Sequence, residues 1–147
     1  MIEVCVPDNV DLVLNLGHEW ADEMQVPDYD HESWLRYVRK YSIYDNACCL
    51  LLRNNENQAV GFIIGGADQV PHTGEIVSQI HYIFVKQRFF EHLTMRELTQ
   101  AFESWAQKIR AVSVVTPSAY YLPEEYQEFF QESGYQTGTS VMAKGLV

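Results

Sequence analysis

The sequence has few basic residues. Lys and Arg together number 10 against 20 Asp and Glu, which gives a formal net charge of -10. A chain with this balance repels the phosphate backbone of nucleic acids, so we expect no nucleic-acid partner. The acidic surface favours solubility, and it leaves open a docking face for a basic protein or mimicry of nucleic acid.

Cysteine is also scarce, with only Cys5, Cys48 and Cys49. An odd number, two of them adjacent in an apolar run, argues against a disulfide framework and favours a reducing compartment, so we expect a cytoplasmic protein. Residues 1–8 lack the basic segment and apolar stretch of an export signal. No run reaches the roughly 18 apolar residues of a membrane-spanning helix, so we expect neither export nor a membrane span.

Several patterns of metal-binding and hydrolytic sites are absent. The five histidines show neither HxxxH nor HExxH spacing. Cys48 and Cys49 cannot point at one metal from a strand, because successive side chains of a strand face opposite sides. No Gly-x-Ser-x-Gly motif of a nucleophilic serine is present. We therefore expect no metal site and no serine hydrolase.

The composition is that of a globular domain. Hydrophobic residues make up 47% of the 147 residues and charged residues 20%. The chain contains no internal repeat, low-complexity tract or linker, so residues 1–147 are expected to form a single domain.

Hydrophobic periodicity and turn signals predict the order β-α-α-β-β-β-α-β-α-β. Alternation in the fourth strand places Ile80, Tyr82 and Phe84 on one face and the residues between them on the other. Thr94 and Glu97 are predicted to form the capping box of the next helix. The first predicted elements are a strand at 2–6, a helix at 10–21 capped by Asp8 or Asn9, and a helix capped by Asp30. Strands follow at 47–53 and 58–66 (with a bulge or strand end at Gly65–Gly66), joined by a turn at 54–57, and at 75–85, which is expected to be buried on both faces. The last elements are a helix from about 94 to 109 with an apolar stripe, a strand at 111–115, a helix at 123–133 and a strand at 136–144.

This order resembles the GCN5-related N-acetyltransferase (GNAT) family over nearly the whole chain. The stretches that carry the resemblance are Ala59–Phe62 in the third strand, Tyr82–Val85 at the end of the fourth, and Phe129–Tyr135 in the last helix and its glycine turn. The resemblance implies an α/β fold with a mixed central β-sheet flanked by helices. It also implies an N-acetyltransferase that uses acetyl-CoA as co-substrate.

By the same resemblance, acetyl-CoA lies where the fourth and fifth strands separate, and the backbone of Ile83, Phe84 and Val85 pairs with its pantetheine arm. The family continues with a phosphate-binding loop that begins with Arg or Gln and contains two small residues. Glycine lets the backbone approach a pyrophosphate, and free N–H groups at a helix N-terminus receive its charge. Arg88 matches the first position, whereas Glu91 and Leu93 replace the small residues.

The resemblance further implies an acid that protonates the departing thiolate and a base that takes the amine proton. The acid is a tyrosine on the last helix, but Phe130 stands at that position and has no proton to give. Tyr126 lies one helical turn earlier and is the candidate in its place. Base candidates come from the fourth strand. The candidate catalytic residues are thus Tyr126, His81 and Glu75.

The segment 120–130 is both aromatic and acidic. It predicts either a helix that buries Phe129 beneath solvated glutamates or a surface that docks another protein. The chain also resembles compact, acidic GNAT-like proteins of bacteriophages, which implies the host cytoplasm or the virion as its location. Two functions remain open: an N-acetyltransferase, and a catalytically inactive GNAT-fold component that binds a protein partner.

Overall fold

The computed structural model describes residues 1–117, 122–137 and 144–146. Its elements confirm the predicted order as far as the last helix. The predicted strand at 136–144 falls largely on residues 138–143, outside the described residues, and the described residues on both sides of them have no regular secondary structure. The elements are β1 (Ile2–Val4), α1 (Val10–Glu23), α2 (His31–Tyr41), β2 (Ala47–Arg53), β3 (Ala59–Gln69), β4 (Ile76–Val85), the 3-10 turn η1 (Gln87–Phe89), α3 (His92–Lys108), β5 (Ala111–Val115) and α4 (Glu124–Glu132).

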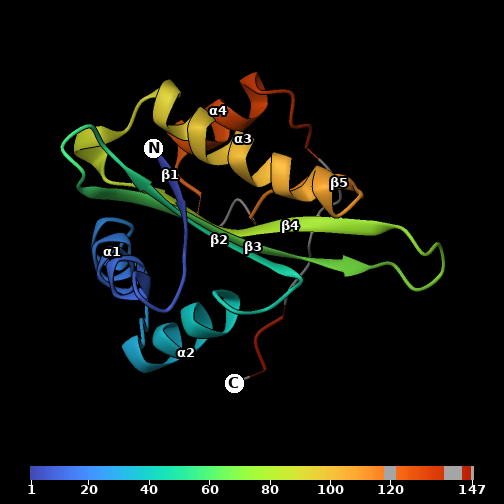
Figure 1. The fold of residues 1–147 in the computed structure, drawn as a ribbon, viewed down its shortest axis with the longest axis horizontal. Coiled ribbons are helices and arrows are strands. Elements are labelled where there is room, and N and C mark those ends of the chain that lie inside the picture. The colour runs from blue at the N-terminus through green and yellow to red at the C-terminus, as the bar shows by residue number, and fades with distance from the viewer. Residues whose placement is uncertain (118–121, 138–143, 147) are drawn as a thin grey trace.

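The strands form one mixed sheet. Within the described part of the chain the order is β1-β2-β3-β4-β5. The first four strands pair antiparallel, and β5 joins β4 in parallel after the crossover through α3. Helices α1 and α2 cover one face, and α3 and α4 cover the other (Figure 1). The predicted α/β class is confirmed.

Both faces of the sheet carry a hydrophobic core. In β2, Cys48, Leu50 and Leu52 pack toward α3 and α4, whereas Cys49 and Leu51 pack toward α1 and α2. This alternation follows from the two-residue repeat of a strand, and it places the adjacent cysteines in different cores. The predicted burial of β4 on both faces is confirmed as well.

A β-bulge at His81 interrupts the regular alternation of β4. Ile80 lies opposite Gly65, and Tyr82 lies opposite the next residue, Ile64, so His81 is an extra residue in β4. The predicted faces were therefore wrong for Ile80, which shares the α3 side with Ile83. Glycine at position 65 did signal the bulge, although the inserted residue belongs to the partner strand.

Strand β5 pairs with only the first part of β4. Their register runs from Ile76 opposite Ala111 to Gln79 opposite Val115. Residues 80–85 of β4 therefore lie beyond the end of the pairing. The bulge at His81 begins two residues after the last pair, so the bend in β4 and the separation of the strands coincide.

Helix α3 begins earlier than predicted. Its N-cap is Glu91, which forms a capping box with Thr94, and the Glu91 N–H donates to Thr94 Oγ1 at 3.1 Å. The predicted Thr94–Glu97 box was wrong, because Glu97 accepts from the Met1 ammonium at 3.3 Å instead. The cap predicted at Asp30 is confirmed, since its side chain accepts from the Ser33 N–H at 3.2 Å.

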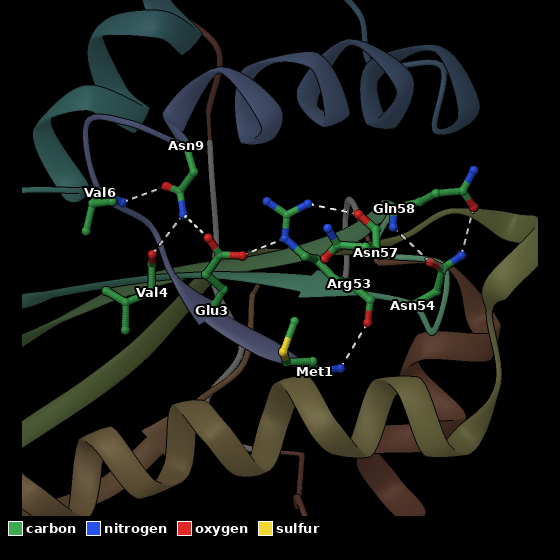
Figure 2. A network of polar contacts seen from close by, with 9 residues as sticks. All are labelled: Met1, Glu3, Val4, Val6, Asn9, Arg53, Asn54, Asn57 and Gln58. Atoms are coloured by element: carbon green, nitrogen blue, oxygen red, sulfur yellow. Dashed lines mark hydrogen bonds and ion pairs between the residues drawn. The ribbon is translucent and has the colours of Figure 1, made fainter.

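A polar network ties β1 to the turn between β2 and β3 (Figure 2). Arg53 Nε donates to Glu3 Oε2 at 2.5 Å, and another guanidinium nitrogen donates to Asn57 O at 3.0 Å. Asn9 Nδ2 donates to Glu3 Oε1 at 2.8 Å. The Met1 ammonium donates to Arg53 O at 2.9 Å. These bonds fix a strand of only three residues at the edge of the sheet.

None of the described helices is both long and apolar enough to cross a bilayer.

Candidate active site

A cavity of about 370 Å³ lies at the place where β4 leaves β5. Its volume suits one small molecule. Elements from both halves of the chain build it: α1 and α2 from one side, β4 from another, and the segments after β5 and before α4 from a third. The lining residues are Trp20, Tyr37, Tyr41, Gln79, Ile80, His81, Tyr82, Ile83, Pro117 and Leu122.

His81 lies in the wall of this cavity. Its Nδ1 is 2.8 Å from Tyr37 Oη, so a residue of α2 fixes the imidazole on β4. Burial lowers the pKa of His81, and the carboxylate of Asp68 acts in the opposite direction with a smaller effect. The imidazole is therefore predominantly neutral at pH 7, which is the state that a general base requires.

Tyr126 lies outside the cavity lining, at the end of β4. Its hydroxyl accepts from the Val85 N–H at 2.9 Å and donates to the Val85 carbonyl at 3.2 Å. The side chain is only 2% exposed, and its ring stacks on Phe90 with 4.9 Å between centroids. Burial raises the pKa of Tyr126. The candidate acid is thus engaged with the backbone that the resemblance assigns to the pantetheine arm.

The start of α3 presents little that would bind a pyrophosphate. Glu91 and Leu93 are exposed at its first positions, and Arg88 lies in η1 with its guanidinium 5.2 Å from the Phe89 ring centroid. Lys86 pairs with Glu19 at 3.2 Å. His92 Nε2 lies 3.1 Å from a carboxylate oxygen of Glu132, across the gap between α3 and α4.

The remaining predicted residues divide between the two ends of β4. Ile83 lines the cavity, whereas Phe84 packs toward α1 and α2 and Val85 is held by Tyr126. Glu75 is exposed at the opposite end of the strand and does not line the cavity. The structure therefore brings together His81 and Ile83, but not Glu75, Tyr126 or Arg88.

Solved structures share this fold over nearly the full length of the chain. A ribosomal-protein-alanine N-acetyltransferase from Brucella melitensis biovar Abortus 2308 superposes with a TM-score of 0.76 at 17% identity, covering 99% of each chain. A GNAT family acetyltransferase from Staphylococcus aureus gives 0.75 at 15% identity, covering 99% of this chain and 98% of the other. The chain has the GNAT fold.

A third GNAT-fold neighbour is AAC(6')-Iy, solved in complex with a bisubstrate analogue of CoA and acetylneamine. It gives a TM-score of 0.80 at 16% identity, covering 99% of this chain and 96% of the other. No protein-family model and no curated protein sequence matches the chain.

The residues of this GNAT fold fit the thioester end of acetyl-CoA but not its nucleotide end. Residues 80–83 of β4 line the cavity beyond the β5 register, where a thioester has room. At the other end, Tyr126 already satisfies both backbone groups of Val85, and the Glu91 carboxylate stands where a pyrophosphate would be repelled. The chain thus fits an acyl thioester but not the nucleotide end of CoA in the arrangement that the resemblance implies.

The aromatic wall of the cavity was not predicted from the sequence. Trp34, Tyr37 and Tyr41 follow the three- and four-residue spacing of one helix face, but this spacing predicts a helix and not a cavity wall. Trp34 is indeed buried, but Tyr37 and Tyr41 line the cavity. Their distinction from core residues depends on how α2 lies over β4, which no local pattern encodes.

Proposed function

We propose that the protein is an N-acyltransferase that moves an acyl group from a thioester to an amine bound in the cavity. The observation that carries the proposal is the position of His81. It is a neutral imidazole on a bulge of β4, in the wall of a cavity at the end of the β4–β5 pairing. The acetyltransferase neighbours support the same chemistry at the level of the fold.

In this proposal His81 accepts the proton that the amine loses. The Tyr37 contact matters because it selects the tautomer: when Nδ1–H donates to Tyr37 Oη, Nε2 keeps a free lone pair. Burial raises the pKa of Tyr37, so its phenol stays protonated and adds no charge beside the imidazole. Tyr37 is thus a positioning residue and His81 the catalytic base.

The acyl donor supplies an activated carbonyl when it is bound. Acetyl-CoA is the donor that the fold suggests, and AAC(6')-Iy was solved with a CoA analogue. The part of this chain that would hold the thioester is residues 80–83. Phe84, Val85 and Arg88 remain the candidates for the rest of the arm, and Tyr126 would have to leave Val85 before the arm could pair there.

The test is acetyl transfer to a panel of primary amines, together with thermal unfolding with and without acetyl-CoA. A donor at about a hundred times its Kd adds about 2.7 kcal/mol to the free energy of unfolding, which raises the Tm by roughly 5–10 °C. We expect both a Tm rise and a transfer rate that His81→Gln lowers by about 100-fold or more. The matched control is His72→Gln in the β3–β4 turn, which should leave the rate unchanged.

A second candidate function is a catalytically inactive GNAT-fold component that binds another protein, the role expected of a bacteriophage-type relative. The hydrogen bonds between Tyr126 and Val85 favour it, because they close the backbone on which the arm would pair. Phe129 and Phe130 are buried, so the surface of α4 offers its exposed glutamates to a basic partner. A flat Tm with acetyl-CoA and no transfer to any amine would favour this role over the enzyme.

A further inference from the structure

The side chains that line the cavity at His81 restrict what it can bind. Ten of the residues that the structure describes line it, and no Asp, Glu, Lys or Arg is among these ten. Four of the ten are Trp or Tyr, and these come from α1, α2 and β4. The described part of the lining therefore offers no carboxylate to pair with a cation and no basic group to pair with an anion.

The aromatic rings form one continuous group. Tyr82 meets Trp20 edge-on at 5.2 Å and Tyr37 edge-on at 5.3 Å between centroids. Tyr37 lies 4.5 Å from Tyr41, and the Tyr41 ring meets the His81 imidazole edge-on at 5.2 Å. Rings locked against one another keep their orientation when a ligand enters, so little freedom is lost on binding.

Aromatic faces attract an organic cation without needing a carboxylate. The attraction holds here because the wall itself is uncharged: Tyr37 is protonated and His81 is predominantly neutral at pH 7. A single ammonium group on an apolar body suits such a wall. A polyamine does not, because each further ammonium would lose its water shell with no acidic partner in the lining.

We propose that the amine held in this cavity is a small monoamine with an apolar or aromatic body. The inference rests on the proposed function for the role of the amine as acceptor, but the binding itself needs no donor. The cavity volume of about 370 Å³ sets the size of the ligand, because it is at the lower end of what small-molecule sites use.

The test is isothermal titration of the full chain with 2-phenylethylamine, without any acyl donor. The matched probes are 2-phenylethanol, which keeps the ring and lacks the charge, and spermine, which keeps the charge and lacks the apolar body. We expect 2-phenylethylamine to bind at least about 10-fold more tightly than either. Equal or tighter binding of spermine overturns the proposal, and so does the absence of 2-phenylethylamine binding.

Variants of two tyrosines locate the binding. Tyr41→Leu removes a ring from the cavity wall, and Tyr44→Leu is the matched control, because Tyr44 is 56% exposed and does not line the cavity. We expect Tyr41→Leu to weaken 2-phenylethylamine binding about 10-fold and Tyr44→Leu to leave it unchanged. Tyr41→Phe keeps the ring and should restore binding, which separates ring loss from misfolding. Equal effects of the two Leu variants overturn the location.

The experiments distinguish failure of the inference about the ligand from failure of the acyltransferase proposal. If 2-phenylethylamine binds at this wall but is not acylated, the inference about the ligand stands and the acyltransferase proposal falls. If transfer occurs to spermine and not to 2-phenylethylamine, the acyltransferase stands and the inference about its acceptor falls.

Discussion

At the scale of single residues, His81 combines a backbone irregularity with an unusual environment for its charge. The folded state lowers the pKa of this imidazole, whereas the unfolded chain has the ordinary value of about 6.5. The unfolded state therefore binds more protons than the folded state just below pH 6.5. Stability rises with pH in that window and is lost as the pH falls through it.

We expect the free energy of unfolding to drop less in His81→Gln than in the unmodified chain when the pH is lowered from about 7.5 to about 5. Urea unfolding at each pH measures the decrease in the free energy of unfolding for the variant and for the unmodified chain. His72→Gln is the control, since His72 is exposed in the β3–β4 turn, and it should follow the unmodified chain. Identical drops in the unmodified chain and His81→Gln would contradict the role assigned to burial of this imidazole.

Gly17 is a second residue whose identity the packing dictates. A Cβ at this position would lie 1.9 Å from Trp34 Nε1, so α1 and α2 could not keep their contact. Trp34 cannot turn aside freely, because its indole stacks on Trp20 at 5.7 Å and on Tyr37 at 5.6 Å.

We expect Gly17→Ala to lower the free energy of unfolding by about 2 kcal/mol. Overpacking costs about 1–3 kcal/mol or more, and the better helix propensity of Ala returns about 1 kcal/mol at most. Gly145→Ala is the control, because a Cβ there meets nothing within 4 Å. Chemical denaturation measures both, and a Gly17→Ala chain as stable as the control would show that the helices can separate at little cost.

At the scale of secondary-structure elements, local sequence signals were sufficient to predict which helices and strands exist and in what order, as far as the last helix. The Asp30 cap, the apolar stripe of α3 and the turn at residues 54–57 each come from neighbouring residues, and each was predicted from the sequence. The bulge at His81 was not, because it arises from pairing with Gly65 on another strand. The start of α3 shifted because Glu97 found a partner in the Met1 ammonium, which is 96 residues away.

The same limit applies to the site. The sequence indicated His81 from its type and place on a strand, but its partner Tyr37 lies 44 residues away on α2. The hydrogen bond from the Val85 N–H to the Tyr126 hydroxyl likewise joins two residues that are 41 positions apart in the sequence. Such pairs depend on tertiary packing, so a single sequence names the participants at best and not their contacts.

The contact between α4 and β4 gives a prediction at this scale. Tyr126→Phe keeps the ring against Phe90 but removes the hydroxyl, which leaves the buried N–H and carbonyl of Val85 without this partner. We expect a loss of about 1–3 kcal/mol in the free energy of unfolding. Tyr44→Phe, at an exposed position, should cost nothing measurable. A loss no larger than that of Tyr44→Phe would mean that water replaces the hydroxyl.

At the scale of the whole molecule, the dominant property is the excess of negative charge. The formal net charge is -10, and ion pairs such as Arg53–Glu3 and Lys86–Glu19 use part of the small supply of cations. Self-repulsion of the remaining carboxylates opposes the compact state. Partly exposed ion pairs contribute only about 0–1 kcal/mol each to the free energy of unfolding. Salt weakens both these pairs and the repulsion between carboxylates, and we expect the weaker repulsion to have the larger effect on stability.

We therefore expect the Tm to rise when NaCl increases from about 10 mM to about 150 mM, because the Debye length falls from about 30 Å to about 8 Å. A double variant, Glu56→Lys and Glu128→Lys, changes two charges from -1 to +1 and brings the net charge from -10 to -6. Its Tm should rise less with salt. A Tm that falls with salt in the unmodified chain would show that ion pairs outweigh repulsion.

His81 is one residue more than the pairing of β4 with β3 requires. Ile80 faces Gly65 and Tyr82 faces Ile64, so a chain from which position 81 is deleted would bring these two pairs together as neighbours in a regular ladder. Every other side chain of the strand would keep its present face, because the pairing on either side is already in step. One residue has thus been added to an otherwise regular pairing of β3 and β4, and that residue contributes the imidazole in the wall of the cavity.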